Sequence, residues 1–259
     1  MNKRKQGPEE ALKRIEEVKR KGVTELDLHF LNLSELPSEI FQLSNLTTLN
    51  LRNNLLSSLP PAFSQLVNLV SLDLSENQLS SVPPEVWQLK KLSSLLLAHN
   101  KLITLPPDFK KLTNLTALSL YNNQLTTLPS YFGKLTNITA LDLGCNDLVI
   151  SPSELWQLKN LIHLSLGSTQ LTMLPPDLFQ LKNLTSLYLF KNKLTEIPSA
   201  VGQLKKLIVL DLRWNNLKEV PSEIWQLETL TKISLWGNHP KLWPTQLNLF
   251  LRERKKYIR

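Results

Sequence analysis

The sequence is poor in cysteine and glycine and has no long apolar segment. Its 259 residues include one cysteine, Cys145, and seven glycines. A single cysteine excludes an internal disulfide, which is typical of a protein from a reducing compartment. No apolar run approaches the roughly 18 residues needed to cross a bilayer, and the first residues lack the apolar stretch of a secretory signal. We therefore expect a cytoplasmic protein, with delivery into a host cell as the open alternative.

The motifs of common catalytic sites are also missing. There is no glycine-rich phosphate loop, no C-x-x-C, no H-E-x-x-H and no G-x-S-x-G. In the repeat pattern described below, His99 is expected about 10 Å from Cys145, too far for a catalytic pair. Asp142 and His163 are expected to be diagonal neighbours roughly 7–8 Å apart, with no third member in view. We expect no catalytic residue, no metal site and no cofactor.

What the sequence does contain is a repeat of 23 residues. The frame L-x-x-L-x-L-x-x-N recurs nine times without insertion, and its last position runs from Asn54 to Asn238. A proline recurs with the same period ten times, from Pro37 to Pro244. A fixed period of this kind predicts one elongated solenoid, a stack of near-identical small repeats.

Each repeat has the pattern of one short strand followed by a turn. In the repeat from Leu69, Leu72 and Leu74 alternate with polar residues, which is the period of a half-buried strand. Asn77 ends the strand, and its amide can bond the backbone of its own and the neighbouring repeat, so that the asparagines form a ladder. Pro83 then opens a short helical or 3-10 turn. We expect the strands to pair in parallel, and the wider turns to curve the stack with the sheet inside.

The consensus LxxLxLxxNxLxxLPxxhxxL resembles the leucine-rich repeat family in its 23-residue intracellular form, over roughly residues 23–244. It is similar to bacterial cytoplasmic leucine-rich repeat arrays and to the repeat regions of Roco-type GTPases and Ras-scaffold proteins. The resemblance implies an α/β solenoid with the shape of a curved horseshoe, with a parallel sheet on the concave face and short helical or 3-10 turns on the convex face. It also implies that the concave face binds proteins. The first repeat departs from the pattern, with Leu31 where asparagine would stand.

Both ends of the repeats are expected to carry capping helices. Residues 1–22 are the N-terminal cap, in which the segment from Pro8 to Lys21 is amphipathic and Gly22 ends the helix. Residues 23–244 hold ten repeats, and residues 245–259 are the C-terminal cap. The apolar face of the first cap consists of Ala11, Leu12, Ile15 and Val18. Four ion pairs are expected on this helix: Glu9–Lys13, Glu10–Arg14, Glu16–Arg20 and Glu17–Lys21. The apolar face of the second cap consists of Leu247, Phe250 and Leu251.

The net charge of +8 lies at the two ends of the chain. Residues 1–22 contain eight Lys/Arg and four Glu (+4), residues 239–259 contain six and one (+5), and the residues between contain sixteen and seventeen (−1). A nucleic-acid-binding protein carries a basic stripe on its binding face, and these repeats do not. We expect a monomer with a protein partner of unknown identity and no nucleic acid; a membrane-surface role for the basic C-terminal helix is the less favoured alternative.

The positions that point outward from the sheet change character along the chain. In the third to seventh repeats they are mostly small or polar, with Leu96 and Tyr121 as the main exceptions. Later repeats present aromatic and basic residues, the composition of interface hot spots. We interpret the following residues as a partner-binding patch: Tyr188, Phe190, Lys191, Arg213, Trp214, Trp236 and, from an earlier repeat, Tyr121.

Phe190, Arg213 and Trp236 occupy the same frame position in three successive repeats. We expect the Arg213 guanidinium to stack between the two aromatic side chains in cation–π contact, with Asp211 helping to orient it. The alternative is that the aromatic residues shield the end of the sheet and bind nothing. Two other functions stay open: a structural or assembly protein that oligomerises through its ends or convex face, and, from the resemblance alone, a regulator of a small GTPase.

Two adjacent repeats depart from the consensus. Thr169 replaces an asparagine of the ladder, and Ser151 replaces the apolar residue before Pro152. The two changes together predict a looser stack between the sixth and seventh repeats.

Overall fold

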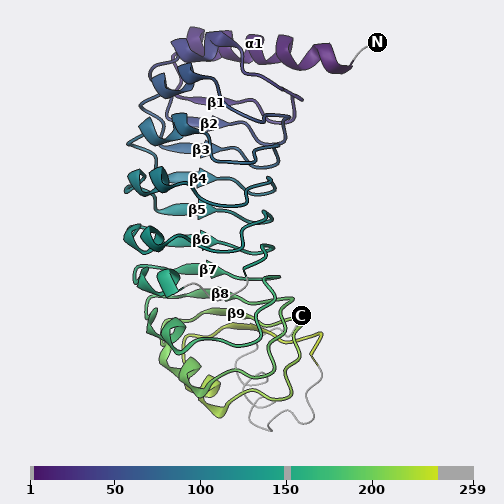
Figure 1. Ribbon diagram of the computed structural model, residues 1–259, viewed down its shortest axis with the longest axis vertical. Helices are drawn as coiled ribbons and strands as arrows, with labels where there is room; N and C mark the ends of the chain where they lie inside the picture. The colour runs from purple at the N-terminus through teal and green to yellow at the C-terminus, as the bar shows by residue number, and fades with distance from the viewer. Residues whose placement is uncertain (1–2, 149–152, 239–259) are drawn as a thin grey trace. The chain divides into compact units, whose positions relative to one another are not determined.

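The computed structural model describes residues 3–148 and 153–238. Within these residues the chain forms one α-helix, α1 (Lys3–Lys21), ten strands and nine 3-10 turns (Figure 1). The strands have three residues each: β1 (Glu25–Asp27), β2 (Thr48–Asn50), β3 (Ser71–Asp73), β4 (Ser94–Leu96), β5 (Ala117–Ser119), β6 (Ala140–Asp142), β7 (His163–Ser165), β8 (Ser186–Tyr188), β9 (Val209–Asp211) and β10 (Lys232–Ser234). The 3-10 turns have five residues each: η1 (Ser38–Gln42), η2 (Pro61–Gln65), η3 (Pro84–Gln88), η4 (Pro107–Lys111), η5 (Ser130–Lys134), η6 (Ser153–Gln157), η7 (Pro176–Gln180), η8 (Ser199–Gln203) and η9 (Ser222–Gln226).

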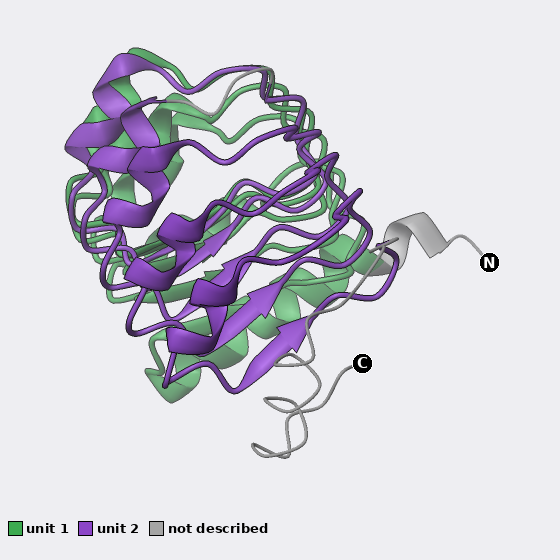
Figure 2. Cartoon of the chain, turned by 90° about the horizontal axis from the view of Figure 1, so that it is seen from below, with its two compact units in different colours: residues 1–124 green, residues 125–259 purple. Residues whose placement is uncertain are grey.

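The chain divides into two compact units, unit 1 (Met1–Gln124) and unit 2 (Leu125–Arg259), which Figure 2 colours separately. Unit 1 contains α1 and β1 to β5, and unit 2 contains β6 to β10. Within each unit every strand pairs in parallel with the strand of the next repeat, and the register is constant: Leu26 pairs with Leu49 in unit 1, and Leu164 with Leu187 in unit 2. In each unit the order of the strands in the sheet is their order along the chain, as an unbroken period predicts.

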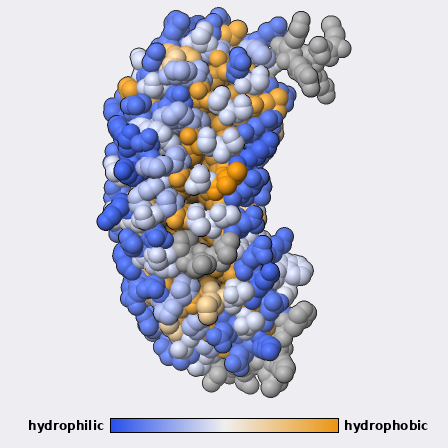
Figure 3. All heavy atoms as spheres, viewed as in Figure 1, coloured by the Kyte–Doolittle hydropathy of each residue, from blue (hydrophilic) through white to orange (hydrophobic). Residues whose placement is uncertain are grey.

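The leucines of the strands form the core of each unit. The fourth and sixth frame positions are buried in all ten repeats; Leu72 and Leu74 are 0% exposed, and so is Leu212. Each such side chain contributes about 2 kcal/mol by burial. The 3-10 turns add larger groups to the core, such as the fully buried Phe63 and Phe179. In the view of Figure 3, hydrophilic residues line both edges of the visible face, with less polar residues between them.

The expected asparagine ladder is present. The amide nitrogen of Asn77 donates to the carbonyl of Leu51 in the preceding repeat (3.0 Å) and to that of Leu74 in its own (3.1 Å). Its side-chain oxygen accepts from the Leu56 amide at 3.0 Å. The same pattern recurs at Asn54, Asn100, Asn123, Asn192, Asn215 and Asn238. Each asparagine therefore ends one strand and bonds two repeats together.

Thr169 fills the ladder position differently. Its hydroxyl donates to the Leu166 carbonyl of its own repeat (2.7 Å), and its amide donates to the side-chain oxygen of Asn192 (3.0 Å). A hydroxyl has one hydrogen, so Thr169 cannot also donate to the preceding repeat as asparagine does. The looser stack at this point stays a prediction, because Ser151 and Pro152 lie outside the described residues.

The N-terminal helix begins earlier than its sequence suggests. We expected it to start at Pro8, but α1 runs from Lys3 and continues through Pro8, which removes one intrahelical hydrogen bond. Ala11, Ile15 and Val18 are buried as expected, while Leu12 is half-buried. Of the expected ion pairs, Glu10–Arg14 (2.9 Å) and Glu17–Lys21 (2.6 Å) form. The helix packs on β1 and η1; the expected C-terminal helix lies outside the described residues.

Candidate functional site

The proposed patch residues of unit 2 follow directly after their strands. The backbone places Phe190, Arg213 and Trp236 in adjacent repeats: the Lys191 amide donates to the Arg213 carbonyl at 2.8 Å, and the Trp214 amide donates to the Trp236 carbonyl at 3.0 Å. Tyr188 is half-buried in β8, in register with Ser165 and Asp211. The side chains, however, are arranged differently from the expected stack.

Arg213 forms an ion pair with a carboxylate and does not stack between two aromatic rings. Its Nε donates to both oxygens of Asp211 (2.8 and 3.0 Å), and its Nη2 donates to Asp211 Oδ2 at 2.6 Å. These hydrogen bonds raise the pKa of the guanidinium. Among the described residues, no cation–π contact joins Arg213 to Phe190 or Trp236, so the expected sandwich is wrong. The guanidinium instead forms a charge-assisted bidentate pair with the buried carboxylate. The expectation that Asp211 orients Arg213 is confirmed.

Trp214 and Trp236 pack against each other in the open. Their ring centroids lie 4.3 Å apart with an interplanar angle of 62°, an edge-to-face arrangement. They are 47% and 44% exposed, respectively. The pair depends on Gly237: a Cβ there would lie 2.6 Å from Trp214 Cε3, and the residue has a φ of +80°. Glycine is the residue that fits both the backbone and the ring.

Phe190 turns toward the preceding repeat. Its ring lies over Gly167, where an added Cβ would overlap the Cε1 and Cζ atoms of the ring. Gly167 occupies in its repeat the frame position that Phe190 occupies in the next. The two aromatic features of unit 2 are thus each seated on a glycine, one on Gly167 and the other on Gly237.

The eighth frame position has a left-handed backbone in every repeat, which sequence reasoning missed. Its φ is +52° at Lys191 and +55° at Trp214, and values from +52° to +58° recur at Phe30, Asn53, Glu76, His99, Asn122, Cys145 and Ser168. Glycine would normally mark such a position, but only Gly237 does so. This conformation sets the direction of the Trp214 side chain.

A hollow opens beside Trp214. It has a volume of about 470 Å³ and is lined by Trp214, Lys191, Asn192, Lys193 and Gln170. Lys193 Nζ donates to Gln170 Oε1 at 3.0 Å. Lys193 and Gln170 were not among the expected site residues, because both follow the ladder position and so lie outside the strand positions that point outward from the sheet.

Tyr121, which we grouped with the patch, belongs to unit 1. Its ring meets His99 edge-on at 5.2 Å, and His99 Nδ1 lies 2.7 Å from the side-chain nitrogen of Asn122. Elsewhere on the sheet face of unit 1, Arg52 donates to Glu76 at 2.6 and 3.0 Å. Asn53 donates to the same carboxylate, and these hydrogen bonds lower the pKa of Glu76, that from Arg52 most.

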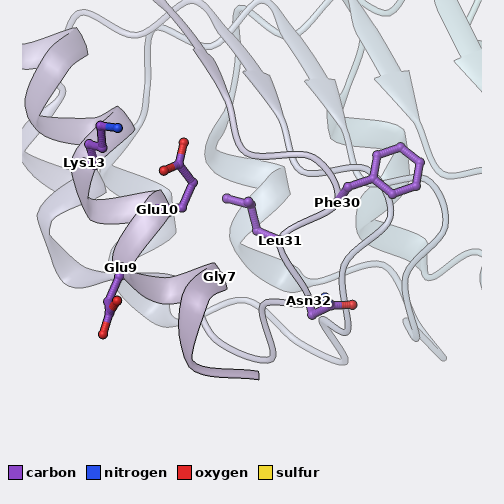
Figure 4. A pocket seen from close by; sticks show the side chains of 7 residues that line it. All are labelled: Gly7, Glu9, Glu10, Lys13, Phe30, Leu31 and Asn32. Carbon is purple, nitrogen blue, oxygen red and sulfur yellow. The ribbon is translucent and has the colours of Figure 1, made fainter. Parts of the chain in front are cut away.

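A second hollow lies between α1 and the loop after β1. It has a volume of about 640 Å³ and is lined by Gly7, Glu9, Glu10, Lys13, Phe30, Leu31 and Asn32. Figure 4 shows Leu31 pointing toward the helix and the Phe30 ring pointing away from it. Gly7 allows the close approach, since a Cβ there would overlap the Leu31 carbonyl. The charged residues that line this hollow carry both signs, and Glu10 forms an ion pair with Arg14.

Asp142 and His163, the pair considered for catalysis, are not directly opposite each other in the sheet. Asp142 is in register with Ser165 and takes a hydrogen bond from it, while His163 is in register with Ala140. Burial raises the pKa of Asp142 despite the bonds from Ser165 and the Gly144 amide. Among the described residues, no cluster of three or more His, Cys, Asp or Glu is suited to a metal ion. The described part of the chain also has no helix of the length and apolarity that a membrane span requires.

Comparison with known proteins identifies the repeat. The family model for the leucine-rich repeat matches residues 21–79, 60–102, 90–148, 159–217 and 182–239. The chain belongs to the leucine-rich repeat family. No curated protein matches this leucine-rich repeat protein in sequence.

Solved leucine-rich repeat structures resemble it over most of its length. A leucine-rich repeat protein of Leptospira interrogans is 32% identical, covers 95% of this chain and 80% of its own, and has a TM-score of 0.57. The leucine-rich repeat domain of the type III effector XopL is 25% identical, with coverage of 90% and 82% and a TM-score of 0.73. The Arabidopsis receptor kinase HAESA, solved with the peptide hormone IDA and the co-receptor SERK1, is 32% identical with a TM-score of 0.71. That match covers 85% of this chain but only 39% of the HAESA chain.

Proposed function

We propose that this leucine-rich repeat protein is a non-enzymatic protein-binding module, and that the sheet face of unit 2 contacts an extended segment of its partner. The observation that carries the proposal is the exposed pair of Trp214 and Trp236, with ring centroids 4.3 Å apart. In the same proposal the protein is a cytoplasmic monomer, and residues 1–22 and 245–259 cover the ends of ten repeats.

Two packed tryptophans on the surface expose apolar area to water, which is unfavourable in a protein that binds no partner there. An exposed aromatic patch leaves apolar area in contact with water, whereas a partner that covers it gains about 25 cal/mol per Å². The pair is also fixed before binding, since Trp214 is held by Trp236 and seated on Gly237. A rigid side chain loses little rotamer entropy when a partner docks, so more of the contact energy appears as affinity.

The structural relatives favour the same role. HAESA was solved with a peptide hormone, and the plant peptide hormone receptor RGFR1 was solved in complex with RGF2. These receptor complexes support the choice of an extended segment as the partner's contact. None of the residues described above supports the alternative function, regulation of a small GTPase.

Assembly through the N-terminal end is the second candidate. Phe30 is 60% exposed beside the hollow of about 640 Å³ at α1. A large exposed apolar side chain at that end of the chain suits self-association. The molar mass in solution separates the two candidates: a dimer that Phe30→Ala converts to a monomer would favour assembly.

The double variant Trp214→Ala/Trp236→Ala tests the binding proposal. Affinity capture with the wild type, followed by titration of the recovered partner, should give a loss of about 100-fold or more in affinity for the variant. The matched control is Ile103→Ala/Met173→Ala, which removes two other exposed apolar side chains, 58% and 71% exposed, outside the patch. The control should bind as the wild type does.

Thermal melting distinguishes a contact surface from internal shielding. Because both tryptophans are nearly half exposed, the double variant should melt within a few degrees of the wild type. A large drop in melting temperature would instead support the alternative in which the aromatic residues only shield the sheet. Unchanged capture of the same partner by the double variant would contradict the proposal.

A further inference from the structure

The hollow beside Trp214 is lined by basic and neutral groups only. Lys191 and Lys193 flank the buried ladder residue Asn192, and because Asn192 points inward both lysines are exposed. The remaining lining groups are Gln170 and the Trp214 ring. The residues that line the hollow therefore include two lysines and no acidic residue.

The neighbouring carboxylate does not neutralise these lysines. Asp211 is 4% exposed and is bonded by Arg213 through three hydrogen bonds of 2.6 to 3.0 Å. Lys193 has the neutral partner Gln170 at 3.0 Å. Within residues 3–148 and 153–238, the Lys191 ammonium has neither a hydrogen-bond acceptor nor an ion-pair partner. An ammonium group has three donors, so the hollow offers positive charge and free donors together.

We propose that the hollow receives the carboxylate of an aspartate or glutamate from an extended segment of the partner protein, and that a nearby apolar side chain of this segment packs on Trp214 and Trp236. This inference rests on the proposed function and specifies the chemistry of its partner. Trp214 lines the hollow and also belongs to the ring pair, so the acidic and apolar subsites are contiguous. Side chains two residues apart on one face of an extended segment are about 7 Å apart, which predicts the order acidic–x–apolar or its reverse.

A carboxylate fits these groups better than a phosphoryl group does. Phosphate recognition favours bidentate arginine, and the Arg213 fork is already occupied by Asp211. Nucleic acid would need a continuous basic surface, whereas Asp142 and Asp211 lie on this same sheet face. An acidic peptide needs only a local positive site, which the two lysines supply.

Selection from a random peptide display library tests the proposal, with four proteins as targets. These are the wild type, Lys191→Glu/Lys193→Glu, the matched control Lys205→Glu/Lys206→Glu, and Trp214→Ala/Trp236→Ala. The control changes two neighbouring exposed lysines of unit 2 away from the hollow. Peptides selected by the wild type and the control should carry Asp or Glu two residues from an aromatic or aliphatic residue, and Lys191→Glu/Lys193→Glu should select Lys or Arg at the acidic position.

A titration then measures the electrostatic part. The best wild-type peptide, followed by fluorescence anisotropy, should bind at least about tenfold more weakly when its acidic residue is replaced by the amide. Its affinity should also fall as sodium chloride rises from about 50 to about 500 mM. Circular dichroism of each variant confirms that the fold is retained.

The outcomes separate this inference from the proposed function. If the wild type and Lys191→Glu/Lys193→Glu select the same sequences while the double tryptophan variant selects none, the binding face stands and the acidic subsite is wrong. If the wild type selects no peptide, the proposed function fails and this inference with it. If a phosphoserine peptide or oligothymidylate displaces the acidic peptide at a lower concentration than the peptide itself requires, the hollow is a phosphoryl site and the proposal is overturned.

Discussion

The two units share one scaffold and present different sheet faces. In both, leucines of three-residue strands fill the core and asparagines join the repeats. The face of unit 1 carries charged groups that pair with one another, such as Arg52 with Glu76 at 2.6 Å. The face of unit 2 has its buried acid, Asp211, bonded to Arg213 and leaves the tryptophan pair exposed. The repeat thus decides where a side chain points, and the variable positions decide whether the side chains of the face pair with one another or stay exposed.

The largest effect should be the same in both units. Asn77→Ala and Asn215→Ala each remove a buried side chain that donates to the preceding repeat and accepts from a leucine amide. Each change should lower the free energy of unfolding by about 3 kcal/mol, because it leaves buried backbone groups without partners. Urea denaturation measures both. A difference of more than about 1 kcal/mol between them would mean that the two scaffolds are not equivalent.

A smaller effect should appear in unit 2 alone. Asp73 and Asp211 occupy the same frame position, and each accepts from the amide two residues on, at 2.8 and 3.1 Å. Asparagine keeps that acceptor, so Asp73→Asn should change the free energy of unfolding by no more than about 0.5 kcal/mol. Asp211→Asn also weakens the bonds to Arg213, whose side chain is 38% exposed, and should cost about 1 kcal/mol. Equal effects in urea denaturation would show that the pair with Arg213 adds nothing.

Most of the scaffold could be predicted from the sequence, because a strict period constrains every repeat in the same way. Leu72 and Leu74 mark a strand by alternation, Asn77 marks its end, and Pro83 marks the following turn, and all three features are found. The start of α1 was predicted less well. Pro8 looked like a first helical residue, but the sequence gives no measure of how much a helix can lose at one missing hydrogen bond.

The side-chain arrangement of the candidate site could be predicted only in part. The repeat pattern places both Asp211 and the aromatic side chains near Arg213. Only the structure shows that the Asp211 carboxylate is the partner of the guanidinium. The left-handed eighth position is hidden because residues such as Trp214 and Lys191 occupy it in place of glycine. The contact of Trp214 with Gly237 depends on that backbone, so the hollow beside it could not be found from the pattern of leucines.

The smallest predicted effect depends on pH and belongs to unit 1. Hydrogen bonds from Arg52 and Asn53 lower the pKa of Glu76 below its usual value of 4.5. A carboxyl with a lowered pKa in the folded state adds stability above its unfolded pKa and loses it as the pH falls through the folded value. Arg52 and Glu76 are 51% and 28% exposed, so at pH 7 Glu76→Gln should cost no more than about 0.5 kcal/mol.

The cost of Glu76→Gln should shrink as the pH is lowered from 4.5 and vanish once Glu76 is protonated in the folded protein. Urea denaturation at neutral and acidic pH measures the difference, with Glu219→Gln, an exposed glutamate of unit 2, as the matched control. A cost that stays constant across this range would mean that the charge of Glu76 is not what stabilises the face of unit 1. The difference between the sheet face of unit 1, whose charges pair with one another, and that of unit 2 would then depend only on the exposed tryptophans of unit 2.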